Sequence, residues 1–459
     1  ADIGVRDLDF VLDPEGIPRF ATGIDDDDNF LLYAAGKDGL DWRAIPHDEA
    51  GGNFRPFALT PGAGQVFARY SVNDGPLSLV RAGLDGAGRS ALVEDPFGSV
   101  GEVEWDATAQ PFAATLVHGK PQVVYFDPAS PQAEEHRMLL GLFPGYHVSY
   151  ANHSQDGALS LLLVYSDRDP GMWYLFDRTQ AQVRLLFASR EGIDPERMGE
   201  RRYFRFTASD GMELDGYLTI PAGVEHPASM PMVLLPHGGP HVEGDRWHFD
   251  TDAQFLASRG YLVLQVNYRG SLGRGYGFQQ AGFREWGGRI QDDLIDGVRW
   301  AIGQGHADPA RICAYGASFG AYSAMMVAAR APELISCAAG VAGLYDLRSF
   351  TTRSDAARTS SGRAYFARAV GSGDAHLRDN SPTSLAASIA APVFLAHGEQ
   401  DERTPYAQAV AMKKALEDAG RAPEWMSVPR EGHGFYSDGN NIEFYRRLEA
   451  FLDSHIGAG

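Results

Sequence analysis

Cysteine, positive charge and long apolar runs are all scarce in this sequence of 459 residues. Its two cysteines, Cys313 and Cys337, cannot build a disulfide framework or a cysteine-rich zinc site. Both lie in apolar segments, where we expect buried free thiols. The 40 lysines and arginines stand against 60 aspartates and glutamates, which gives a net charge of −20. Because such an acidic chain repels phosphate groups, neither nucleic-acid binding nor docking on an anionic membrane is expected.

No apolar run approaches the roughly 18 residues that a membrane span needs. The chain starts at Ala1, without a methionine or an apolar leader, so we expect that residues upstream have been removed or that the chain is part of a longer one. These features predict a soluble protein of the cytoplasm or the periplasm and do not choose between the two compartments. Apolar residues make up 44% of the chain, which is ample for packed cores.

Residues 1–195 are predicted to form one all-β domain. Short apolar or alternating runs, broken by Asp-Gly and Asn-Asp-Gly turns, indicate strands at 30–33, 65–70, 122–126 and 159–165. Strand-rich units begin near residues 8, 54, 100 and 146, a spacing typical of propeller blades. A β-sandwich with irregular loops is the alternative. We find no amphipathic helix in this part, and we interpret the aspartates at 25–28 as a solvated loop, not a calcium site.

Residues 196–459 are predicted to form an α/β domain, because buried strand patterns alternate with helical patterns. This alternation is typical of a parallel sheet with helices on both faces. The expected strands are 231–235, 261–266, 312–315, 336–341, 392–396 and 424–428, and the expected helices are 292–303, 321–330, 407–420 and 442–455.

Gly316 to Gly320 form a G-x-S-x-G segment that directly follows the strand at 312–315 and directly precedes a helical run. A sharp strand-to-helix turn of this kind projects a serine hydroxyl, here that of Ser318, beside a helix N-terminus that favours an oxyanion. Serine needs a base, and the base needs an orienting carboxylate. In this fold the partners follow in the order Asp, then His, after later strands, and Asp401 and His433 stand there.

The segment Leu235 to Pro240 contains His-Gly-Gly-Pro after the strand at 231–235. Its backbone N–H groups can join that of Phe319 in an oxyanion hole. We do not expect zinc at His237, His241 or His248, since no HExxH helix or acidic ligand pattern accompanies them. His397 and the remaining histidines are interpreted as structural or surface residues.

On these motifs, residues from about 200 to 455 resemble the catalytic domain of the prolyl oligopeptidase family of serine peptidases, with the acylaminoacyl-peptidase branch as the nearest in pattern. The matching segments are 237–240, 267–271, 286–287, 308–312, 316–320, 397–401 and 431–435. The family carries an N-terminal β-propeller that admits only short or unfolded peptides. Its propellers usually have more blades than the roughly four expected here, so either part of a propeller precedes this chain or the lid is unusually small.

The resemblance implies Ser318 as nucleophile, His433 as general base and acid, and Asp401 as the orienting carboxylate. It implies the N–H groups of Gly239 and Phe319 as the oxyanion hole. Arg403 matches the family's arginine that binds a substrate carbonyl, with a surface salt-bridging arginine as the alternative.

Arg269 is interpreted as structural. Phe319 and Ala321 depart from the family's usual Tyr and Gly, so the pocket is expected to differ in detail. We see no paired Glu-Glu helix of the dipeptidyl-peptidase type.

The leading hypothesis is therefore a serine peptidase that cleaves short peptides, as an oligopeptidase, acylaminoacyl-peptidase or dipeptidyl-peptidase. A carboxylesterase on the same α/β-hydrolase scaffold is the alternative, and Arg403 is the residue that discriminates between them. A non-catalytic binding protein is disfavoured by the intact triad. No cofactor is implied, and family members often assemble, which leaves a homo-oligomer open.

Overall fold

The computed structural model describes residues 5–13, 15–25, 30–36, 38–46, 53–62 and 64–457. The chain forms two compact units. Unit 1 comprises residues 1–166, 170–193 and 273–277, and unit 2 comprises residues 167–169, 194–272 and 278–459. Most of the aspartate run at 25–28 lies outside the described residues.

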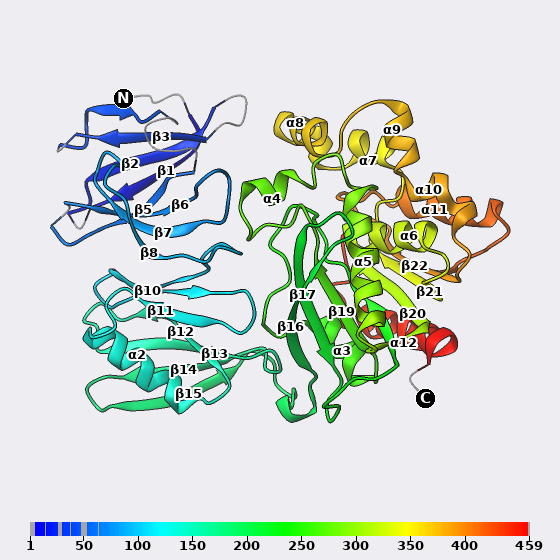
Figure 1. The fold of residues 1–459 in the computed structure, drawn as a ribbon, viewed down its shortest axis with the longest axis horizontal. Helices are drawn as coiled ribbons and strands as arrows, with labels where there is room; N and C mark the ends of the chain where they lie inside the picture. The colour runs from blue at the N-terminus through cyan, green and yellow to red at the C-terminus, as the bar shows by residue number, and fades with distance from the viewer. Residues whose placement is uncertain are drawn as a thin grey trace. The chain divides into compact units, whose positions relative to one another are not determined.

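Unit 1 holds four antiparallel sheets within its described residues, each built from strands that are consecutive in the chain (Figure 1). They are β1 (Arg6–Leu12), β2 (Pro18–Ile24), β3 (Phe30–Ala35) and β4 (Trp42–Ala44); β5 (Arg55–Leu59), β6 (Val66–Tyr70), β7 (Ser78–Ala82) and β8 (Ser90–Val93); β9 (Val103–Trp105), β10 (Pro111–Leu116) and β11 (Gln122–Tyr125); and β12 (His147–His153), β13 (Leu159–Tyr165), β14 (Met172–Asp177) and β15 (Gln182–Ala188). The sheets start at residues 6, 55, 103 and 147, which confirms the predicted spacing. Such meanders are the building units of propellers, so the propeller-like interpretation is confirmed over the sandwich.

Unit 1 contains one helix that its sequence pattern did not predict. This helix, α2 (Pro131–Leu142), starts from Ser130, whose hydroxyl accepts a hydrogen bond from the N–H of Ala133, and it has proline in its first position. A serine cap followed by proline is a helix-start signal, and it was not recognised in the sequence. The helix also carries two adjacent glutamates, Glu134 and Glu135. The expectation of no Glu-Glu helix of the dipeptidyl-peptidase type stays a prediction. Glu135 pairs with Arg178 at 2.8 Å and accepts a 2.7 Å hydrogen bond from Tyr150.

Unit 2 is built on one eight-stranded sheet with the order β16-β17-β19-β18-β20-β21-β22-β23. Its strands are β16 (Glu200–Thr207), β17 (Glu213–Ile220), β18 (Met230–Leu234), β19 (Leu262–Asn267), β20 (Ala307–Ala317), β21 (Cys337–Val341), β22 (Val393–Gly398) and β23 (Glu424–Val428). From β19 onward all neighbours pair in parallel. The expectation of a parallel sheet needs one correction, because β16 pairs antiparallel with β17, and β17 antiparallel with β19.

Helices cover both faces of this sheet (Figure 1). The helices of unit 2 are α3 (Thr251–Ser258), α5 (Arg289–Gly303), α6 (Phe319–Arg330), α7 (Leu347–Arg353), α8 (Ser360–Ala369), α9 (Asp374–Asp379), α10 (Pro382–Leu385), α11 (Ala407–Asp418) and α12 (Asp438–Ile456). The short helix α4 (Tyr276–Gln280) begins in unit 1 and ends in unit 2.

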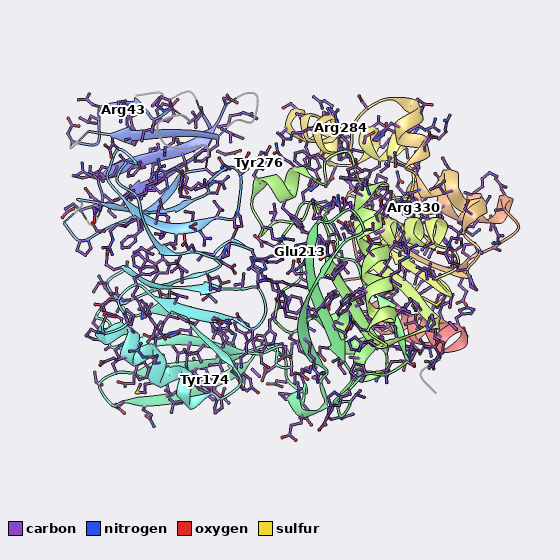
Figure 2. All side chains as sticks on the ribbon, in the orientation of Figure 1. Arg43, Tyr174, Glu213, Tyr276, Arg284 and Arg330 are labelled. Carbon is purple, nitrogen blue, oxygen red and sulfur yellow. A yellow bond between two sulfur atoms is a disulfide. The ribbon has the colours of Figure 1, made fainter. Side chains whose placement is uncertain are left out.

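The side chains of β18 alternate between the faces: Met232 packs in the cluster that contains α5, α6 and α11, and Val233 in the cluster that contains α3 and α12. Arg330 at the end of α6 also reaches Asp292 on α5 at 2.7 Å (Figure 2).

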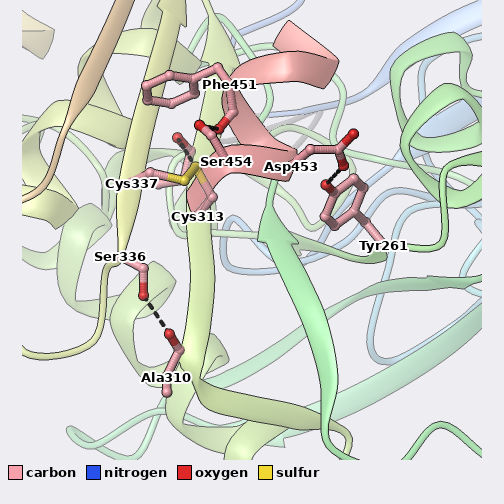
Figure 3. Close-up of a disulfide and its surroundings, with 9 residues drawn as sticks. Tyr261, Ala310, Cys313, Ser336, Cys337, Phe451, Asp453 and Ser454 are labelled. Atoms are coloured by element: carbon pink, nitrogen blue, oxygen red, sulfur yellow. Dashed lines mark hydrogen bonds between the residues drawn. A yellow bond between two sulfur atoms is a disulfide. The ribbon is translucent and has the colours of Figure 1, made fainter. Parts of the chain in front are cut away.

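The two cysteines are not free thiols, contrary to expectation. Cys313 on β20 and Cys337 on β21 form a disulfide between neighbouring parallel strands, with their α-carbons 4.6 Å apart (Figure 3). Their pairing depends on the register of two strands that are 24 residues apart in the sequence. The apolar pattern around each cysteine indicates burial but says nothing about this register.

Candidate active site

Ser318 occupies the sharp turn between β20 and α6, as predicted. Its φ of 56° and ψ of −119° are strained for a non-glycine residue. Its backbone N–H donates to the carbonyl of Val341 at 3.0 Å, which anchors the turn on the end of β21. A β-carbon at Gly316 would lie 2.5 Å from the backbone of Gly320, so the tight turn requires glycine there. The turn holds the Ser318 side chain at the carboxyl edge of the parallel sheet, where it is partly exposed.

The loop after β18 lies against this turn. A β-carbon on Gly238 would be 3.8 Å from that of Ser318, which places the loop at the serine. Gly239 has a φ of +116°, a conformation that favours glycine. Phe319 is the first residue of α6, so its N–H has no acceptor within the helix. The predicted pair of oxyanion donors, Gly239 and Phe319, thus comes from two segments in contact, and their role stays a prediction.

His237 connects the same loop to the segment that follows β19. Its ring stacks on that of Tyr268 at 4.2 Å, and its Nε2 lies 2.8 Å from the hydroxyl oxygen of Ser271. The Tyr268 hydroxyl donates to the His237 carbonyl at 2.9 Å. Burial lowers the pKa of His237 to about 4, so the ring is neutral at physiological pH. Within the described ranges, no group of three or more His, Cys, Asp or Glu side chains is arranged to hold a metal ion.

Asp401 and His433 meet as the sequence predicted. Asp401 follows β22, His433 follows β23, and His433 Nδ1 lies 2.8 Å from Asp401 Oδ2. Because the carboxylate can only accept, Nδ1 carries the proton, which leaves Nε2 of His433 as a base. Burial alone would raise the pKa of Asp401, but hydrogen bonds from His397 and His433 outweigh it and hold that pKa below its usual value. Asp401 is therefore an ionised acceptor at any physiological pH.

Thr404 connects the aspartate loop to the serine turn. Its backbone N–H donates to Asp401 Oδ1 at 2.9 Å, and its hydroxyl lies 2.8 Å from both Asp401 Oδ2 and the carbonyl of Ala342. Ala342 follows Val341, whose carbonyl holds the N–H of Ser318. Two consecutive carbonyls at the end of β21 thus anchor the nucleophile turn and the carboxylate loop.

The loop that carries His433 is fixed at both ends. The Gln400 N–H donates to the Glu431 carbonyl at 2.8 Å, and a β-carbon at Gly398 would meet the backbone of Glu431. The Glu431 carboxylate accepts hydrogen bonds from the N–H groups of Tyr436 and Ser437 at 2.8 and 3.1 Å. These hydrogen bonds lower the pKa of Glu431 and keep it ionised.

His397 is a member of this site that the sequence analysis placed among structural or surface residues. Its side chain is fully buried, and its Nε2 lies 2.8 Å from the Thr404 carbonyl and 3.3 Å from Asp401 Oδ2. Only its spacing of four residues from Asp401 could have signalled this contact, and that spacing is common between residues that never meet.

Arg403, the predicted substrate-binding residue, has an exposed side chain that pairs with Asp355 at 3.2 Å. Its backbone N–H donates to Asp401 Oδ1 at 2.9 Å, so its position is fixed relative to the carboxylate. Its role toward a substrate remains a prediction. Among the residues that the structure describes, no helix is long and apolar enough to cross a membrane.

Comparison with known proteins gives concordant matches. The model of the prolyl oligopeptidase family matches residues 247–459, which include Ser318, Asp401 and His433. The chain is 29% identical to dipeptidyl aminopeptidase BIII of Pseudoxanthomonas mexicana, over 80% of this chain and 55% of that protein. It is 24% identical to the acylamino-acid-releasing enzyme of Sus scrofa, over 54% of this chain and 34% of that protein.

The fold is similar to that of a puromycin-hydrolysing peptidase of Mycobacterium tuberculosis, with a TM-score of 0.75 at 19% identity, over 99% of this chain and 70% of that chain. The chain spans about half the length of the curated relatives it matches.

Proposed function

We propose that the chain is a serine peptidase of the prolyl oligopeptidase family, whose model matches residues 247–459, and that it hydrolyses short peptides through an acyl-enzyme. The observation that carries the proposal is the 2.8 Å contact between His433 Nδ1 and Asp401 Oδ2, at the edge of the sheet where Ser318 stands on a strained turn. An oriented base and a partly exposed serine hydroxyl at the same edge of the sheet are what the proposed acyl transfer needs.

In the first half of the reaction, Ser318 Oγ attacks the scissile carbonyl carbon while His433 Nε2 takes the hydroxyl proton. The carbonyl oxygen becomes an oxyanion, which the N–H groups of Gly239 and Phe319 stabilise. The C–N bond then breaks, and the amine leaves with the proton from His433. In the second half, water gives a proton to His433 and attacks the acyl carbon. The ester bond to Ser318 then breaks, and His433 returns the proton to Ser318 Oγ. Asp401 stays ionised throughout and stabilises the imidazolium that forms twice per cycle.

We assign Arg403 to a backbone carbonyl of the bound peptide. Its guanidinium already lies on the aspartate loop, and its partner Asp355 is partly exposed, so exchange of this ion pair for a substrate contact has little cost. The relatives include a dipeptidyl aminopeptidase and an acylamino-acid-releasing enzyme, which act at the two kinds of peptide N-terminus, free and blocked. The proposal covers both kinds, and the choice between them is left to experiment.

The test is a panel of chromogenic peptide amides with free and N-acetylated termini, together with p-nitrophenyl esters and puromycin. Ser318→Ala should abolish amide turnover and leave the circular-dichroism spectrum unchanged. The matched control is Ser336→Ala, since Ser336 directly precedes β21 and its hydroxyl bonds only the Ala310 carbonyl among the contacts described. The preference between free and acetylated amides then identifies the substrate class.

Three outcomes would count against the proposal. Amide turnover that survives in Ser318→Ala would remove the serine mechanism. Ester turnover without amide turnover would make the chain a carboxylesterase, in which Arg403 is an ordinary surface arginine. Arg403→Ala should raise KM for peptide amides and leave ester turnover unchanged, so an equal effect on both substrates would contradict the assigned role of Arg403.

A further inference from the structure

Two imidazole nitrogens lie beside the same carboxylate oxygen of Asp401, although a serine triad uses one. His433 Nδ1 lies 2.8 Å from Oδ2 on one side, and His397 Nε2 lies 3.3 Å from the same oxygen on the other. The side chains of Asp401 and His397 are both fully buried, so no water screens their contact. The ionisable groups around the carboxylate are these two histidines and Arg403, whose guanidinium is turned to Asp355.

The contacts of His397 settle which of its nitrogens carries a proton. Nε2 faces the Thr404 carbonyl and the Asp401 carboxylate, which can only accept, so Nε2 must be the donor. Nδ1 is buried, and no hydrogen-bond partner for it occurs in the described part of the chain. A buried nitrogen without a partner has a free-energy cost that a phenylalanine or leucine at this position would avoid. The presence of histidine at this position is therefore better explained by the contacts of Nε2 with Thr404 and Asp401 than by packing.

We infer that His397 is a positioning residue for the proposed peptidase reaction: its Nε2–H, bonded to the Thr404 carbonyl at 2.8 Å, is shared with Asp401 Oδ2 at 3.3 Å and so sets how strongly this carboxylate accepts the proton of His433. The inference rests on the proposed function. A carboxylate oxygen shared among several donors is a weaker acceptor for each of them. His397 thus keeps Asp401 aimed at His433 while limiting how tightly the imidazolium is held, which helps His433 return its proton to the leaving amine.

Removal of the His397 donor should shift the pH profile in one predictable direction. Without His397 Nε2–H, Asp401 becomes more basic, because that hydrogen bond is one of the contacts that lower its pKa. A more basic carboxylate holds the proton on His433 more tightly. The acid limb of kcat/KM should then move to higher pH, by about half a unit to one unit for one lost hydrogen bond to a charged group. At the optimum, kcat should fall about five- to tenfold with KM nearly unchanged.

The experiment compares His397→Phe, which fills the space without a donor, with His397→Gln, whose Nε2 can replace the lost donor. The matched control is His136→Phe in unit 1, because His136 is equally buried and its Nε2 also lies 2.9 Å from a backbone carbonyl, that of Val148. The first readout is the pH profile of peptide-amide turnover. The second is the pH dependence of Ser318 labelling by a fluorophosphonate, which reports on His433 without a peptide substrate. The third is the downfield proton NMR signal of His433 Nδ1–H.

We expect the acid limb and the downfield signal to move in His397→Phe and to return toward wild type in His397→Gln, with no movement in His136→Phe. An acid limb that stays in place in His397→Phe would overturn the inference, as would equal shifts in both His397 variants. If His397→Phe does not fold, His397→Leu, which also lacks a donor, takes its place in the same comparison with His397→Gln. A wild-type protein that labels but turns over no amide would refute the proposed function while leaving this test intact.

Discussion

The carbonyl oxygen of Pro236 lies directly over the α-carbon of Gly320, so close that any β-carbon at position 320 would collide with it. Pro236 begins the loop that carries Gly239, a proposed oxyanion donor, and Gly320 ends the turn that carries Ser318. The second glycine of the G-x-S-x-G segment therefore permits a contact between two segments that are more than 80 residues apart in the sequence. This contact fixes the spacing of the proposed nucleophile and the proposed oxyanion donor.

Gly320→Ala should consequently reduce both the activity and the stability of the protein, and the reduction in activity should be the larger effect. The added methyl must push the Pro236 loop away, and overpacking of this kind costs about 1–3 kcal/mol of unfolding free energy. We expect kcat to fall by about 100-fold, the effect of one lost oxyanion donor. Urea unfolding and amide turnover measure the two effects. Gly303→Ala at the end of α5 is the control, since nothing lies within 4 Å of its added β-carbon and both properties should stay unchanged.

Asp401→Asn tests the orienting carboxylate. An amide at this position can present its N–H₂ group to His433 Nδ1, which favours the wrong tautomer of the imidazole. We expect kcat to fall on the order of 10⁴-fold with little change in KM. Steady-state kinetics with the preferred amide measure the loss, and Asp418→Asn on the exposed end of α11, which removes only a surface ion pair with Lys414, serves as the control. A loss below tenfold would mean that Asp401 does not orient the base.

Glu104 makes the stability of unit 1 dependent on pH. Burial raises the pKa of Glu104 to about 7, and only the N–H of Tyr150 donates to it among the described hydrogen bonds. The folded state thus keeps its proton to higher pH than the unfolded state, which releases it near 4.5. Stability is unaffected below that value, falls as the pH rises from 4.5 to 7, and stays lower above 7, by about 3 kcal/mol in total.

Glu104→Gln should remove this dependence and stabilise unit 1 at pH 8. Urea unfolding of the full chain at pH 5 and pH 8, followed by the fluorescence of unit 1 tryptophans such as Trp105, provides the measurement. Glu102→Gln is the control, because Glu102 is exposed and only adds a repulsive charge. A pH dependence that is the same in Glu104→Gln and in the wild type would contradict the assignment.

Much of the fold follows from local patterns in the sequence. The strands β13 and β23 have the bounds that their apolar runs predict, and the blade-like sheets of unit 1 start within a few residues of the predicted spacing. The helix α2 was missed because its apolar face is weak, and its start at Ser130 and Pro131 had to be recognised from capping signals alone. The strands β16 and β17 were not predicted. Their antiparallel pairing could not have been predicted either, because local sequence does not show the direction of a strand in a sheet.

The candidate site divides in the same way. The contact between Asp401 and His433, and the turn that carries Ser318, could be predicted because the order of strands and motifs places all three residues at the carboxyl edge of the parallel strands. Arg269 could be interpreted as structural, and it forms a buried ion pair with Asp293 at 2.6 Å. His397, Thr404 and the disulfide between Cys313 and Cys337 could not be assigned their contacts, because each depends on the register and twist of strands that only the assembled sheet defines.

The order of the three site loops along the chain has a consequence for protein synthesis. Ser318 follows β20, Asp401 follows β22, and His433 follows β23, which pairs at the outer edge of the sheet. A nascent chain that has emerged from the ribosome as far as Asp401 already contains the nucleophile turn but has no base to activate it. Under the proposed function, hydrolysis can therefore begin only after residue 433 has been translated and β23 has paired with β22.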